Sequence, residues 1–167
     1  MSEQQRQRDQ PRERATYLTL VGLFLGLFAA FSKRERDEQR PLAIGPLDLA
    51  LLRLATFRAG RLAAYDRVTE PLRAPLTETR QDEYGAGENV VAAGSGARKA
   101  IGEMVSCPTC VGTWVSAGLV YGLRVAPRPT RLFLGMMGAM GLAELLDSAN
   151  EAMSWAGKAA RKESAPN

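Results

Sequence analysis

The sequence predicts an all-α fold: a small helical integral membrane protein with three or four short apolar helices and an irregular polar middle segment. Two observations predict this class. Apolar and charged residues are segregated along the 167-residue chain, with apolar runs at 17–31, 47–64, 111–123 and 132–146. Charges are concentrated between these runs. This layout suits helices that satisfy their own backbone groups in hydrocarbon while their ends remain in water. The length leaves room for one domain.

The composition excludes several function classes. The chain has no histidine, which removes the usual serine and cysteine triads and most zinc sites. Its 22 basic residues give a pI near 9.4 and are mostly arginine, which is typical of a GC-rich bacterial source. Basic residues beside apolar helices set membrane topology and contact anionic headgroups, so nucleic acid is not the expected partner.

The first segments are a polar tail and a membrane anchor. Residues 1–14 are almost wholly polar and predict a disordered tail. Residues 15–31 predict an N-terminal anchor helix, in which Gly22 and Gly26 form a GxxxG pattern that allows close helix approach. A cleaved signal peptide is the less favoured alternative, because no clean Ala-x-Ala site follows.

The second apolar segment, 47–65, carries Arg53, Arg58 and Arg61. On a helical wheel these arginines fall within about 140° of one another. A central arginine costs roughly 2.5–3.5 kcal/mol on insertion scales, so a lone lipid-exposed span is not expected. The segment is either an interfacial helix or a span packed among the others with its arginines paired or snorkelling.

The polar middle and the C-terminal third complete the chain. Pro71 and Pro75 interrupt any helix in the charged stretch after Asp66, and glycines follow. The third apolar segment contains a second GxxxG, Gly118 and Gly122. Residues 130–160 predict a glycine- and methionine-rich helix with an amphipathic tail.

The expected location is a bacterial cytoplasmic membrane, which the chain crosses several times. The distribution of Lys and Arg predicts its orientation there. Four spans favour a cytoplasmic N-terminus, whereas three spans favour an external one. Both arrangements place the segment before Cys107 on the cytoplasmic side.

Cys107 and Cys110 are the only cysteines and form a Cys-Pro-Thr-Cys motif at the start of the third apolar segment. Three interpretations are open. A helix N-terminus favours thiolate chemistry, but no thioredoxin-like βαβ pattern surrounds the motif. Zinc needs further ligands, such as Glu103 or two cysteines from a second subunit. The third interpretation is structural, with proline starting the helix and both thiols packed.

Three motifs in order resemble the bacterial family known as domain of unknown function 1360, over roughly residues 47–125. They are an arginine-bearing helix, a turn and a helix start, at residues 56–62, 66–75 and 102–114. The chain has Met104 where the family often has leucine and Thr109 where an aromatic residue is common. The resemblance implies a small bacterial membrane protein, associated in some members with sporulation, and no established activity.

These patterns predict a non-enzymatic membrane protein that packs with itself or another membrane protein and presents a basic cytoplasmic face to lipid or a partner. A thiol-redox or metal-binding protein is the alternative, and no cofactor is expected apart from zinc held across a dimer. Asp66 and Glu70 with nearby arginines suggest a charge network or, equally, an ordinary solvated surface. The residues expected to carry structure or interaction are Arg58, Arg61, Asp66, Thr69, Pro71, Arg73, Glu103, Gly112, Trp114 and the glycines Gly22, Gly26, Gly118 and Gly122.

Overall fold

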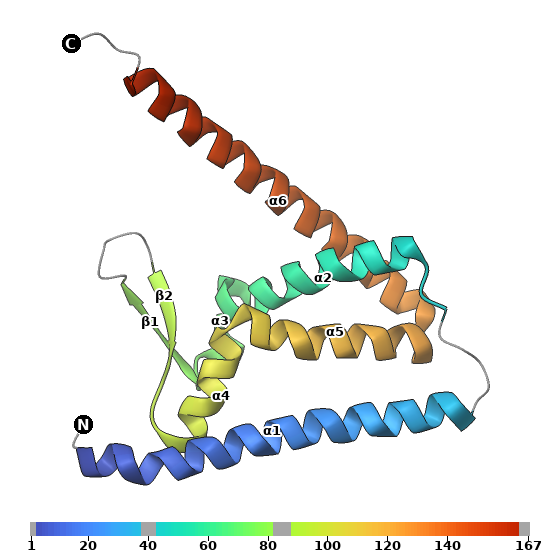
Figure 1. The fold of residues 1–167 in the computed structure, drawn as a ribbon, viewed down its shortest axis with the longest axis vertical. Coiled ribbons are helices and arrows are strands. Elements are labelled where there is room, and N and C mark those ends of the chain that lie inside the picture. Colours follow the sequence, from blue (N-terminus) through green and yellow to red (C-terminus); the bar gives the residue numbers. More distant parts are fainter. Residues whose placement is uncertain (1–2, 38–42, 82–87, 164–167) are drawn as a thin grey trace.

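A computed structural model describes residues 3–37, 43–81 and 88–163 of the chain. Helices and one hairpin follow in this order: α1 (Glu3–Asp37), α2 (Pro46–Tyr65), the 3-10 turn η1 (Arg67–Thr69), α3 (Glu70–Arg73), β1 (Thr77–Gln81), β2 (Glu88–Ala92), α4 (Gly96–Ser106), α5 (Pro108–Val125) and α6 (Pro127–Glu163). Figure 1 shows α2, α5 and the first half of α6 packed together, with α1 on the far side of α5 and the end of α6 projecting away.

The helical class is confirmed, and two details differ from the sequence prediction. Helix α1 already begins at Glu3, so the described part of the expected disordered tail is helical. Its glutamine, arginine and glutamate residues are good helix formers that extend the apolar helix. The polar middle segment is also more regular than expected, because β1 and β2 pair as an antiparallel hairpin with Thr77 opposite Ala92.

The core lies where α2, α5 and α6 meet. Its buried residues are Leu52, Ala55, Leu119, Leu123 and Leu134. Glycines allow the helix backbones to approach closely at this contact. A Cβ atom built on Gly141 of α6 would lie 2.6 Å from the carbonyl oxygen of Leu54 in α2. A Cβ on Gly60 of α2 would lie 2.7 Å from the carbonyl oxygen of Pro108, at the start of α5.

Helix α1 is held by side chains along its length. Phe24 meets Trp114 edge to face, with ring centroids 5.3 Å apart, and Phe31 stacks on Tyr121 at 3.8 Å. At the N-terminal end, Lys99 of α4 lies 3.4 Å from a carboxylate oxygen of Glu13. These contacts fix α1 alongside α4 and α5.

Ion pairs tie together the opposite end of the bundle. Glu35, near the end of α1, pairs with Arg124 near the end of α5. Asp48, at the start of α2, pairs with Arg131 at the start of α6, at 3.2 Å. The C-terminal ends of α1 and α5 and the N-terminal ends of α2 and α6 therefore share one end of the molecule, as Figure 1 also shows.

Two helices are long and apolar enough to cross a membrane, over Asp9–Glu35 in α1 and Pro127–Lys158 in α6. Helices α4 and α5 also qualify as a pair, but they are bent by 77° at Cys107. The apolar window of α1 is unburied within the chain, and only 17% of that in α6 is buried. Most of the apolar surface of these helices is therefore left for a surrounding medium or a partner to cover.

Candidate functional site

The turn after α2 forms a cap on the C-terminal end of that helix. The Thr69 hydroxyl donates to the carbonyl oxygen of Leu62 at 2.6 Å. The Arg73 guanidinium donates to the carbonyl oxygens of Asp66 (2.6 Å) and Tyr65 (3.1 Å) and to the Thr69 hydroxyl (2.8 Å). The last carbonyls of a helix lack partners within the helix and carry partial negative charge, so a cation is favourable there.

This cap gives Asp66, Thr69, Pro71 and Arg73 a structural role. Arg73 is only 4% exposed. Pro71 lies in the first turn of α3, where a missing N–H costs no hydrogen bond. The Thr77 hydroxyl then donates to the carbonyl oxygen of Arg73 at 3.1 Å and joins the cap to the hairpin.

A charge cluster lies beside the cap and joins α2 to α6. Arg58 donates to the Asp66 carboxylate at 2.5 Å. Arg61 pairs with Glu144 of α6 at 2.6 Å, and Arg58 lies 3.8 Å from the other oxygen of that carboxylate. The predicted pairing of Asp66 with an arginine is thus present. Glu70 has an exposed side chain outside the cluster, and Glu144 takes the place expected for it.

The Cys-Pro-Thr-Cys motif forms the bend between α4 and α5. Cys107 caps α5, and its sulfur accepts from the backbone N–H of Cys110 at 3.4 Å. The Cys110 thiol donates to the same sulfur at 2.8 Å. These two donors lower the pKa of the Cys107 thiol. Both cysteines are free thiols.

The metal hypothesis finds no complete ligand set in the described residues. They contain no group of three or more His, Cys, Asp or Glu side chains placed to hold a metal ion. Glu103 instead accepts a hydrogen bond from the Tyr17 hydroxyl and lies 3.6 Å from Lys99. A site shared with a second subunit stays a prediction.

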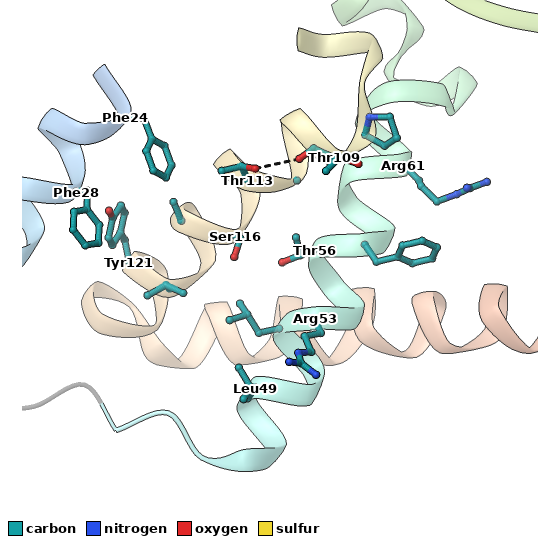
Figure 2. Close-up of a pocket in the computed structure, with 16 residues that line it drawn as sticks. Phe24, Phe28, Leu49, Arg53, Thr56, Arg61, Thr109, Thr113, Ser116 and Tyr121 are labelled. Atoms are coloured by element: carbon teal, nitrogen blue, oxygen red, sulfur yellow. Dashed lines mark hydrogen bonds between the residues drawn. The ribbon is translucent and has the colours of Figure 1, made fainter. Parts of the chain in front are cut away.

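A cavity of about 800 Å³ opens between α1, α2 and α5. Phe24 and Phe28 of α1 and Tyr121 of α5 form much of its apolar wall. Figure 2 shows Thr56 of α2 and Ser116 of α5 pointing toward one another across the space between their helices. The other polar lining residues are Arg53, Arg61, Thr109 and Thr113.

The glycine patterns divide into packed and open positions. Gly22, Gly26 and Gly118 have nothing within 4 Å of a built Cβ atom, whereas Gly122 faces Thr130 of the next helix at 2.7 Å. Gly112 is buried in α5 and faces Thr56 of α2. The GxxxG pattern of α1 therefore makes no helix contact within the described chain. Trp114 packs on α1.

The sequence model of a family described as "Protein of unknown function (DUF1360)" matches residues 51–150. The chain belongs to this family. It is 31% identical to the sporulation protein YjcA of Bacillus subtilis (strain 168) over 110 residues, covering 64% of this chain and 93% of that protein. No solved structure matches the chain.

Several residues at these sites were missed by sequence reasoning. Glu144, Asp48 and Glu35 lie far along the chain from the arginines they pair with. Only Glu144 has a signal in the sequence: it is an acid in the apolar part of α6, as Arg58 and Arg61 are bases in α2. Charged residues inside apolar helices need partners of opposite charge.

Proposed function

We propose that this chain is a four-span protein of the bacterial cytoplasmic membrane that has no enzymatic activity and packs with a second membrane-embedded chain. The observation that carries the proposal is the uncovered apolar surface of α1 and α6 described above. Large exposed side chains on these helices include Leu18, Val21, Leu25, Leu132 and Met136. Lipid hydrocarbon covers this apolar surface, which would be unfavourable to expose to water.

The pairing of helix ends supports four spans over three. Helix α2 begins at the Glu35–Arg124 end of the bundle and finishes beside the hairpin and α4. It therefore runs the length of the bundle between α5 and α6. Arg58 and Arg61 have carboxylate partners, which reduces the cost of burying them. In this arrangement the N-terminus, hairpin and C-terminus face the cytoplasm, as the Lys/Arg rule favours.

The partner is expected to be a second copy of the chain, in contact with α1. Gly22 and Gly26 are exposed on the side of α1 that faces away from Phe24 and α5. In lipid, helices associate through small residues that let their backbones approach. The open pattern on α1 fits that mode of packing.

Disulfide crosslinking in native membranes tests this contact. In a background with both native cysteines replaced by serine, Gly26→Cys is expected to give crosslinked dimers on mild oxidation. The matched control is Phe28→Cys, since Phe28 lies one half-turn away and lines the cavity toward α5. Equal crosslinking at the two positions, or monomer at every expression level, would contradict the proposal.

The alternative function is thiol-redox or metal chemistry at Cys107 and Cys110, which the 2.8 Å approach of the two sulfur atoms favours. Thiol titration with and without chelator, together with metal analysis of the purified protein, separates the two functions. Slow alkylation at neutral pH with no bound metal would leave only the structural role of the motif. Retained function after replacement of both cysteines by serine would lead to the same conclusion.

The relative from Bacillus subtilis is named for sporulation. The same process is the first place to seek a phenotype for loss of this chain.

A further inference from the structure

The cavity between α1, α2 and α5 has the size and walls of a ligand site. Its volume of about 800 Å³ lies within the range of about 300–1,000 Å³ typical of small-molecule sites. Phe24 and Phe28 contribute aromatic surface from α1. Such a wall fits a hydrocarbon chain.

The charge of the cavity has one sign. Among the described residues that line it, two are arginines and none is acidic. Arg61 is already paired with Glu144 and lies over the rings of Phe57 and Tyr65, at 5.7 and 5.9 Å. Arg53 makes no hydrogen bond or ion pair with any described residue. A guanidinium keeps its charge, so Arg53 presents an uncompensated cation to this cavity.

A second polar group at the cavity lacks a partner. The Thr56 hydroxyl oxygen is buried and makes no hydrogen bond within the described residues. It lies one helical turn from Arg53 on α2 and points toward Ser116 (Figure 2). Buried hydroxyl groups normally have a partner, and this one lines the same cavity as the Arg53 guanidinium.

We propose that this cavity binds an anionic phospholipid, with the phosphate group on Arg53 and one acyl chain along the aromatic wall of α1. The inference rests on the proposed membrane location. Arginine binds phosphate in a bidentate manner, and the apolar wall explains why a lipid rather than free phosphate is the occupant. The negative headgroup supplies the charge that the lining lacks.

Native mass spectrometry of the full chain in a neutral detergent tests the site, using dioleoyl-phosphatidylglycerol and dioleoyl-phosphatidylcholine as probes. The anionic lipid is expected to bind more tightly than the zwitterionic one. Arg53→Gln is expected to weaken phosphatidylglycerol binding by about tenfold, since it removes a charge-assisted contact. The matched control is Arg128→Gln, which removes the same charge from an exposed position of α6 outside the cavity.

A second variant tests whether the lipid occupies the cavity. Ser116→Phe fills the space opposite Thr56 and is expected to weaken binding of both lipids, whether or not Arg53→Gln folds. Lipid binding unchanged by Ser116→Phe would overturn the proposal, as would equal losses in Arg53→Gln and Arg128→Gln. Displacement of the lipid by inorganic phosphate alone would indicate a phosphate site instead. A dimer signal lost in Ser116→Phe would assign the cavity to a second copy of the chain.

Carbonate extraction of wild-type membranes distinguishes a failure of the proposed membrane location from a failure of the lipid site. Release of the chain into the soluble fraction would contradict the membrane location itself. Retention in the membrane without any lipid selectivity would overturn only the lipid site.

Discussion

Replacing Arg73 with alanine should destabilise the whole chain, although the residue lies outside the proposed membrane spans. The Arg73 guanidinium is almost fully buried and makes three hydrogen bonds of 2.6–3.1 Å at the end of α2. A hydrogen bond to a charged group contributes about 1.5–3 kcal/mol. Because the three bonds share one side chain and are not additive, we expect a loss of about 3–5 kcal/mol in the free energy of unfolding.

Thermal unfolding in detergent, followed by circular dichroism, measures this loss. A change of 3 kcal/mol lowers the Tm of a chain of this length by roughly 6–12 °C. Arg73→Lys should recover part of the stability, because lysine keeps the charge but cannot reach several carbonyl groups in one plane. The control is Arg80→Ala, whose side chain is 68% exposed and pairs with Glu78 at 3.0 Å. An exposed pair contributes about 0–1 kcal/mol, so equal shifts for Arg73→Ala and Arg80→Ala would refute the capping role.

Two further predictions concern helix packing and thiol chemistry. Gly141→Ala places a methyl group against the Leu54 carbonyl and should lower the free energy of unfolding by about 1–3 kcal/mol. Gly135→Ala, in open space on the same helix, should be neutral or slightly stabilising. Equal Tm values for the two variants in the same unfolding assay would contradict the close contact. The lowered pKa of Cys107 increases its thiolate fraction at pH 7, so alkylation should reach Cys107 before Cys110. Cys110→Ala removes a donor and should move the midpoint of the Cys107 alkylation profile to higher pH, and an unmoved midpoint would show that the Cys110 thiol does not act on it.

The helices were predictable because their signal is local. Apolar runs bounded by charges and prolines gave the positions of α1, α2, α5 and α6, and Pro108 marks the start of α5. The hairpin was missed because neither strand shows clear alternation. Four of the five residues of β1, Thr77–Gln81, are exposed, so the strand has almost no apolar face that a pattern could reveal.

The candidate site was predictable only in part, for a related reason. The sequence indicated Thr69 and Arg73 as important, but their partners are backbone carbonyls of α2, which any sequence provides. The pattern of side chains therefore predicted the pairing of Asp66 with an arginine but not the helix cap that Thr69 and Arg73 form beside it. Arg53 resembles the other two arginines in sequence. Only the structure shows that Glu144 pairs with Arg61 and that Arg53 has no carboxylate partner among the described residues.

The central claim is that α2 crosses the membrane, and single-cysteine labelling tests it most directly. Ala43 precedes α2 and Thr79 lies in the hairpin that follows it, and both side chains are exposed. In a chain with both native cysteines replaced by serine, Ala43→Cys should react with a membrane-impermeant maleimide in intact cells. Thr79→Cys should react only after the cells are opened. Labelling of both positions from the same side would contradict the four-span account.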